Sequence, residues 1–156
     1  MDQFTVGLVV VEEVFRLHVE REHPHKVIEL VGGRQHVSPE IVDTMPAVLA
    51  REVDFGILKP RAEHYQETRI MSDQVARLYS TSHFVPDPLA LVAAVRFNPS
   101  FRDGRQYATQ WQIGEDFFFL AACYYKGEWY IHVGHSPESW GEEWCFTGVA
   151  PIDVYF

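Results

Sequence analysis

The side chains best suited to chemistry gather around one histidine, His132. His132 and His135 form an H-x2-H pair, a spacing that occurs in some metal sites. On a strand, however, positions three apart point to opposite faces. Both imidazoles would reach one ion only if the strand ended near Gly134, so this pair is a weak indication of a metal.

A second histidine pair could converge more easily. His23 and His25 flank Pro24, with Glu22 nearby, but a solvated polar loop explains this segment better. Cys123 and Cys145 lie in apolar runs, without the many paired cysteines of small secreted domains. We therefore predict two buried free thiols in a reducing cytoplasm, no metal site and no cofactor.

His132 belongs to the strongest local pattern of the chain, the aromatic segment 117–133. Two apolar runs joined by Lys126 and Gly127 predict a β-hairpin, because a glycine supplies the positive φ of a tight turn. Alternation along the second strand places Tyr130 and His132 on one face. The opposite face, which we assign to the core, carries Trp129, Ile131 and Val133.

The register of the hairpin decides what lies beside Tyr130 and His132. A two-residue turn places Cys123 and Tyr125 there, whereas a three-residue loop brings the other face of the first strand, with Tyr124. Both registers leave a tyrosine-rich face with one histidine. This face is the second side of a covered sheet, or it lines an interface, or it forms a pocket with Tyr124, Tyr125, Tyr130 and His132.

A second candidate surface is the segment 134–143, which we predict to be a long loop. It combines Trp140 with Glu138, Glu142 and Glu143. A rigid aromatic ring surrounded by acids is typical of a hot spot that accepts Lys or Arg from a partner protein. The alternative is that Trp140 folds back over the sheet and the glutamates are solvated.

Charge narrows the classes of partner. The net charge is −9, and residues 106–156 carry seven acids against one base, Lys126. Such a field repels nucleic acid and anionic membrane surfaces, and it favours a basic or neutral protein as partner. The apolar run 6–11 is too short to span a membrane. Tyr155 and Phe156 offer a further apolar contact that would seal a homodimer.

The elements that position these residues predict a single α+β domain over residues 1–156. We expect an antiparallel β-meander in the C-terminal half, with two or three short helices from the N-terminal half packed on it. The predicted strands are 4–11, 14–20, 27–31, 89–97, 107–113 and 144–149, together with the hairpin. A helix over 8–19 competes with the first two strands, and Asp87-Pro88 could open a helix where we favour the strand 89–97. The predicted helices are a kinked one, or two short ones, from Ser38 through Pro46 to about Val53, ended by Gly56, and a further one over 72–81.

Two functional hypotheses follow. The first is a small, acidic, non-catalytic cytoplasmic module of the inhibitor or immunity type, which binds a protein through its aromatic and acidic C-terminal surface. The second is a small-ligand-binding domain or small enzyme with an aromatic pocket around Tyr130 and His132, in which His132 is an acid, a base or a hydrogen-bond donor.

Overall fold

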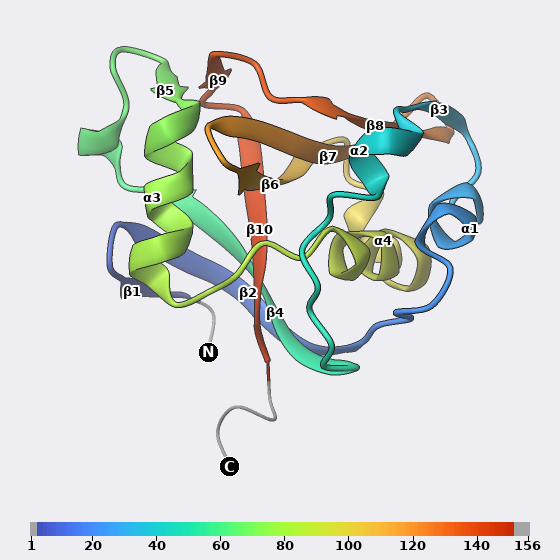
Figure 1. Cartoon of the computed structure of the whole chain (residues 1–156). Coiled ribbons are helices and arrows are strands. Elements are labelled where there is room, and N and C mark those ends of the chain that lie inside the picture. The colour runs from blue at the N-terminus through green and yellow to red at the C-terminus, as the bar shows by residue number, and fades with distance from the viewer. Residues whose placement is uncertain (1–2, 152–156) are drawn as a thin grey trace.

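The chain forms one large β-sheet with helices on both faces (Figure 1). The computed structural model describes residues 3–151. In chain order the elements are β1 (Gln3–Val6), β2 (Val9–His18), α1 (Pro24–Glu29), β3 (Arg34–Val37), α2 (Pro39–Val42), β4 (Glu52–Pro60), η1 (Ala62–His64), β5 (Arg69–Met71), α3 (Ser72–Ser82), α4 (Pro88–Phe97), η2 (Pro99–Phe101), β6 (Gln106–Ile113), β7 (Asp116–Tyr125), β8 (Glu128–His135), β9 (Ser139–Gly141) and β10 (Trp144–Pro151). None of the helices in this part of the chain has the length and apolar character needed to cross a bilayer.

The large sheet has eight strands in the order β1-β2-β4-β10-β6-β7-β8-β3. Neighbouring strands are antiparallel except at two places, where β10 pairs with β6 and β3 pairs with β8 in parallel. The predicted α+β class is confirmed. The predicted C-terminal meander is only the β6-β7-β8 part of the sheet, because four strands of the N-terminal half join it and β10 lies between β4 and β6.

One face of the sheet is covered by α1, α2 and α4. Val27 and Ile28 of α1, Ile41 of α2 and Leu91 of α4 are buried against it. Trp129, Ile131 and Val133 of β8 pack into the same core, as the hairpin pattern predicts. Figure 1 shows these three helices on one side of β10 and α3 on the other.

The opposite face is covered over only part of its width. There α3 and the two-stranded β5–β9 sheet pack a second core, in which Leu78, Ile70, Trp140 and Phe146 are almost fully buried. The helix predicted over 72–81 is thus confirmed as α3. Neither α3 nor the small sheet extends over β8 and β3, and this uncovered part contributes to the candidate site.

Two predicted strands are helices. Residues 89–97 form α4, whose side chains from Ala90 to Val95 are all buried, and such an apolar run looks the same in a buried strand and in a buried helix. Asp87 caps the helix by accepting from the Ala90 N–H, and its carboxylate is held by both terminal nitrogens of Arg21 at 2.7 Å. Residues 27–31, predicted as a strand, lie mostly in α1, which Pro24 opens.

The predicted kinked helix from Ser38 to Val53 is also wrong. Its start is correct, but α2 is one turn long, and Val53 and Gly56 belong to β4. At Gly56 a Cβ atom would come within 3.1 Å of Val11 and 3.3 Å of Phe84, so the glycine allows close packing in mid-strand and does not end a helix.

Candidate functional site

The hairpin turn fixes the face on which a site can form. Lys126 and Gly127 have φ angles of 50° and 83°, which give a two-residue turn with positive φ at both positions. The β7–β8 register therefore pairs Cys123 with Tyr130, and Ala121 with His132. The two-residue alternative is the one that the structure adopts.

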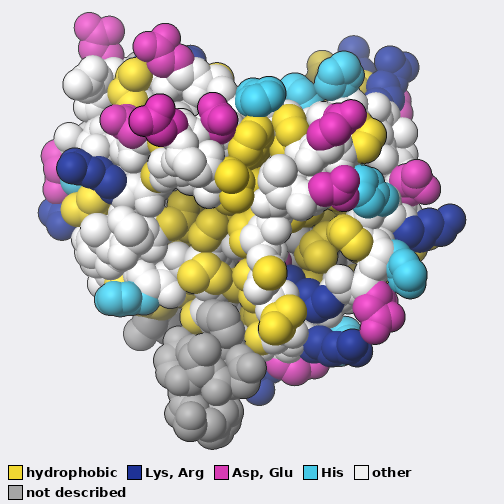
Figure 2. Space-filling model, in the orientation of Figure 1, with side chains coloured by type: hydrophobic (Ala, Val, Ile, Leu, Met, Phe, Trp, Pro, Cys, Tyr) yellow, Lys and Arg dark blue, Asp and Glu magenta, His cyan; other side chains and the backbone are white. Residues whose placement is uncertain are grey.

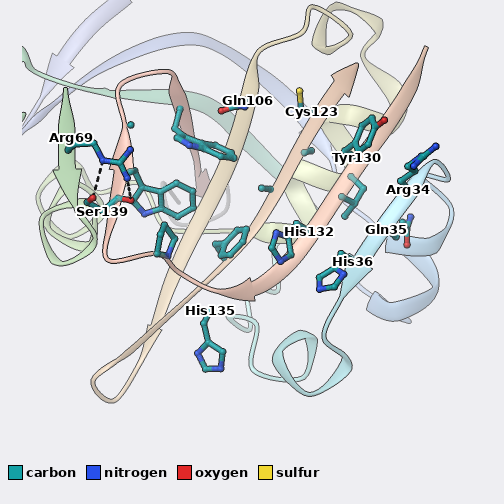
Figure 3. A pocket seen from close by; sticks show the side chains of 18 residues that line it. Arg34, Gln35, His36, Arg69, Gln106, Cys123, Tyr130, His132, His135 and Ser139 are labelled. Atoms are coloured by element: carbon teal, nitrogen blue, oxygen red, sulfur yellow. Dashed lines mark hydrogen bonds between the residues drawn. The ribbon is translucent and has the colours of Figure 1, made fainter. Parts of the chain in front are cut away.

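Strand β3 widens this face. Its parallel register with β8 sets Arg34 opposite Tyr130 and His36 opposite His132, so both side chains project to the same side. Across the sheet from them stand β5 and β9, which bring in Arg69 and Trp140 (Figure 3).

Between these two walls the sheet face is hollow. The depression, which we call the hollow, has a volume of about 700 Å³. Its lining comes from β3, β5, β6, β7, β8, β9 and the start of β10, and comprises Arg34, Gln35, His36, Arg69, Gln106, Phe119, Ala121, Ala122, Cys123, Tyr130, Ile131, His132, His135, Pro137, Ser139, Trp140, Gly141 and Trp144. Its volume falls in the range of about 300–1,000 Å³ that is typical of small-molecule sites.

Aromatic rings form a continuous series along the floor of the hollow. The His132 ring meets Phe119 at 4.8 Å and His36 at 5.1 Å between ring centroids, both edge to face. Phe119 in turn packs against Trp140 at 5.4 Å, and Trp140 against Trp144 at 5.0 Å. These edge-to-face pairs hold the rings in fixed orientations, so the apolar surface of the hollow is preformed.

The charge of the hollow differs from that of the chain. The protein carries −9 overall, yet the lining includes two arginines and three histidines and contains neither Asp nor Glu. The nearest carboxylates are Glu128, whose Oε2 lies 3.5 Å from Arg34 Nε, and Glu143, which reaches over Gly141. Figure 2 shows histidine side chains gathered at the upper edge of the molecule, above β8 and β3.

The two arginines are held differently. Arg34 is largely exposed and is compensated by Glu128. Arg69 donates from Nε to Ser139 Oγ at 3.0 Å and from Nη2 to the Ser139 carbonyl at 2.8 Å (Figure 3). Ser139 thus holds the guanidinium, and among the described residues no carboxylate forms a salt bridge with it.

Two titratable groups of the floor are kept neutral. Desolvation, together with the neighbouring His36, lowers the pKa of His132 below its usual value. Burial, aided by the charge of Asp103, raises the pKa of the Cys123 thiol. At neutral pH the floor thus presents an uncharged imidazole and a protonated thiol, which suit hydrogen bonding and apolar contact better than nucleophilic attack.

Gln106 supplies a further polar group to the lining. Its Oε1 is buried and accepts no hydrogen bond from any residue that the structure describes. A buried acceptor without a donor costs stability, so an N–H or O–H group placed beside it would be favoured.

The sequence-predicted pocket residues divide between the two sheet faces. Tyr130 and His132 line the hollow. Tyr125 shares their face but lies outside the lining, 6.3 Å from Tyr130 between ring centroids. Tyr124 points to the helix-covered face and packs edge to face on Trp129 at 5.2 Å. Its place in the pocket depended on the three-residue loop, which the chain does not form.

The acidic surface predicted to bind a protein partner does not expose the ring of Trp140. Trp140 is 2% exposed, and its Nε1 donates to Gln110 Oε1 at 2.9 Å, because β9 pairs with β5 where a loop was predicted. The ring folds back over the sheet, as in the alternative interpretation of this segment. Glu138, Glu142 and Glu143 are exposed around β9.

The histidine pairs do not form a metal centre. Strand β8 continues through His135, whose ring packs on Phe118 at 4.9 Å, so it does not converge with His132 on one ion. His25 Nε2 lies 2.8 Å from Asp43 Oδ1 at the surface. Within residues 3–151 no group of three or more His, Cys, Asp or Glu side chains has a geometry suited to a metal.

The two cysteines are free thiols that point to opposite faces of the sheet, Cys123 to the hollow and Cys145 to the helix-covered core. The contact predicted for Tyr155 and Phe156 lies outside the described residues.

Sequence reasoning missed Arg34, His36, Arg69 and Gln106. Three of these residues reach the hollow only through pairings between segments distant in the chain, β3 with β8 and β5 with β9. Gln106 begins a strand that was predicted to start one residue later.

Comparison of the chain with models of protein families, with curated proteins and with solved structures finds no match. We therefore infer a function from the geometry of the hollow.

Proposed function

We propose that this protein is a small-ligand-binding domain and that the hollow binds an organic molecule with an apolar, flat body. The observation that carries the proposal is the uncovered half of one sheet face, a depression of about 700 Å³ whose floor is a continuous series of edge-to-face aromatic rings. Pockets that bind most of a small ligand have this size and this mixture of apolar surface with a few polar groups.

Binding is favoured over catalysis by the protonation states of the floor. Neutral His132 can donate or accept one hydrogen bond, and Gln106 Oε1 can accept another. The Cys123 thiol stays protonated, which makes it a poor nucleophile. The polar groups of the hollow thus orient a ligand without an evident nucleophile and base acting together.

A neutral fluorescent probe tests the proposal. N-phenyl-1-naphthylamine, whose emission rises in apolar surroundings, is titrated into the purified protein, and quenching of tryptophan emission is followed in parallel. Two of the four tryptophans, Trp140 and Trp144, line the hollow. We expect saturable binding of one probe per chain in the micromolar range.

The variant Ala121→Phe fills the floor of the hollow and should abolish this binding. Tyr125→Ala is the matched control, because Tyr125 lies on the same hairpin face but outside the lining. Circular dichroism and thermal unfolding check that both variants fold. Saturable binding that survives in a folded Ala121→Phe variant would contradict the proposal, as would no probe binding by the wild type.

The protein-partner hypothesis is the second candidate, favoured by the three exposed glutamates around β9. A basic or neutral partner in the cytoplasm would contact Glu138, Glu142 and Glu143, and the two free thiols suit that compartment. Charge reversal by Glu142→Lys should release such a partner from the protein captured in a native lysate, whereas Ala121→Phe should retain it.

A further inference from the structure

We propose that the ligand of the hollow is an aromatic monocarboxylate whose acid group binds to Arg69. The inference rests on the proposed function and adds the charge and orientation of the occupant. It follows from three observations: the lining without Asp or Glu, the Arg69 guanidinium held by Ser139 without a salt bridge to any described residue, and the aromatic rings that line the same hollow.

The charges of the lining determine whether the hollow favours an anionic or a cationic ligand. A ligand that enters the hollow meets two arginines and no acid in the lining, although the chain as a whole is strongly acidic. An organic cation would be desolvated beside like charge, which is unfavourable, whereas an anion exchanges water for charge-assisted hydrogen bonds. The lining therefore selects an anion.

The two arginines of the lining differ in how well each could bind the acid group of the ligand. Both arginines are exposed, but Arg34 already has Glu128 beside it. Arg69 is held by two hydrogen bonds to Ser139, which use Nε and one Nη2 donor. The Nη1 donors remain for a ligand, and the fixed side chain loses little conformational freedom on binding.

The position of Arg69 also determines where the body of the ligand lies. Arg69 pairs across the β5–β9 ladder with Gly141, next to Trp140, and Trp144 begins the following strand. A carboxylate at Arg69 thus places an attached ring against Trp144 and over Phe119, with the far end toward Tyr130 and His132. The Glu143 carboxylate lies over Gly141 at this corner, where a Cβ atom would collide with it, so the ligand approaches Arg69 from the side of the hollow.

The charges around Arg69 also distinguish a ligand with one negative charge from a ligand with two. A phosphate group carries nearly two negative charges and is usually bound by several cations, a helix N-terminus or a series of backbone N–H groups. The hollow offers one arginine without a salt bridge to any described residue and an imidazole kept neutral, with Glu143 close to the same corner. This arrangement matches a single carboxylate.

Isothermal titration calorimetry with three matched probes tests the inference: 1-naphthoate, its neutral amide 1-naphthamide, and 1-naphthyl phosphate. We expect naphthoate to bind about 10-fold or more tightly than the amide, the ratio typical of a charge-assisted pair. Arg69→Gln should reduce this ratio to about one, and Arg69→Lys, which keeps the charge but not the geometry, should give an intermediate ratio.

Three further variants sharpen the test. Glu143→Gln removes the nearby negative charge and should strengthen binding of naphthoate but not of the amide. Arg34→Gln should lower the ratio less than Arg69→Gln does. Arg61→Gln is the matched control outside the hollow, where Arg61 pairs with Glu63 at 2.9 Å, and it should leave the ratio unchanged.

The outcomes separate the two proposals. Equal binding of acid and amide, or a ratio that survives in folded Arg69→Gln, would overturn the inference and leave the ligand-binding function intact. Tighter binding of the phosphate would overturn the assignment to carboxylates. If neither the naphthalene probes nor the neutral N-phenyl-1-naphthylamine binds, the proposed function itself fails.

Discussion

Two halves of one sheet face differ in what lies over them. In the covered half, α3 and the β5–β9 sheet pack Leu78, Ile70 and Phe146 into a closed core. In the hollow half, β8 and β3 extend beyond these elements, and the outward positions carry His132, His36 and other polar or amphipathic side chains. Both halves share strands, alternation and twist, so the difference arises from the reach of the covering elements and not from the sheet.

The rings at the boundary connect the halves. Trp140 belongs to the buried core and also lines the hollow, and Phe119 packs on it from the floor. A ligand in the hollow would therefore contact the core directly, and its binding would add to the stability of the fold. From this difference we predict how substitutions or pH changes in either half alter the free energy of unfolding, and how the pKa of His132 in the hollow is shifted.

The largest difference should appear on truncating one aromatic side chain in each half. Phe146→Ala empties a site that is 0% exposed and should lower the free energy of unfolding by about 3–5 kcal/mol. Tyr130→Ala, at 36% exposure, should change it by about 0.5 kcal/mol. Urea unfolding measures both. An equal loss for the two variants would show that the hollow is packed shut in solution.

A second difference should appear at high pH in the covered half. Burial raises the pKa of Tyr79 from 10.0 to about 12. Because the folded state keeps this phenol neutral while the unfolded state ionises, stability should fall as pH rises from 10 to 12. The full loss is about 2.7 kcal/mol, at 1.36 kcal/mol per pKa unit.

The control for this pH effect is Tyr79→Phe, which cannot ionise at this position. Its unfolding free energy, compared with that of the wild type between pH 9 and pH 11, should fall less steeply. Identical slopes for the two proteins would mean that Tyr79 is accessible to solvent, and that α3 covers the sheet less tightly than the structure shows.

A third test addresses the boundary. Trp140→Phe keeps an aromatic ring but removes the donor to Gln110 Oε1, which lies in a residue that is 2% exposed. Leaving that oxygen without a partner should cost about 1–3 kcal/mol in urea unfolding. The double variant with Gln110→Met should cost less than the sum of its single changes, since it removes both partners of the bond.

The smallest expected effect is the shifted pKa of His132 in the hollow. In an NMR titration the His132 ring should protonate with a midpoint below the usual histidine value of 6.5, because desolvation and His36 disfavour its charge. His36→Gln should move the midpoint upward. Since the folded pKa is lowered, the contribution of His132 to stability is lost as pH falls below 6.5 toward the folded value. A midpoint at or above 6.5 would contradict a desolvated floor.

Local patterns in the sequence predict the elements that depend on neighbouring residues. The hairpin around Lys126 and Gly127, helix α3 and strand β6 agree closely with expectation. The segments 27–31 and 89–97 are predicted as strands because short, mostly apolar runs lack the periodicity that separates a buried helix from a buried strand. At 89–97 the Asp87-Pro88 start signal was the better guide.

The candidate site could be predicted only as far as its first two strands. Alternation in the hairpin placed Tyr130 and His132 on a face that was either covered or hollow. Whether this face is covered or hollow depends on two short strands. The four-residue strand β3 pairs with β8, which is distant in the chain, and β9 buries Trp140 among acidic neighbours. Short strands with distant partners leave no periodic pattern to detect.

The position of β10 has a consequence for how the molecule forms. Of all the strands in the large sheet it is the last to be synthesised, yet it lies between β4 and β6. Until it emerges from the ribosome, the β1-β2-β4 ribbon and the β6-β7-β8 ribbon have no hydrogen-bonded strand between them, and each exposes an unpaired edge. Folding of the large sheet therefore awaits the synthesis of β10, and contacts of long sequence separation make it slow.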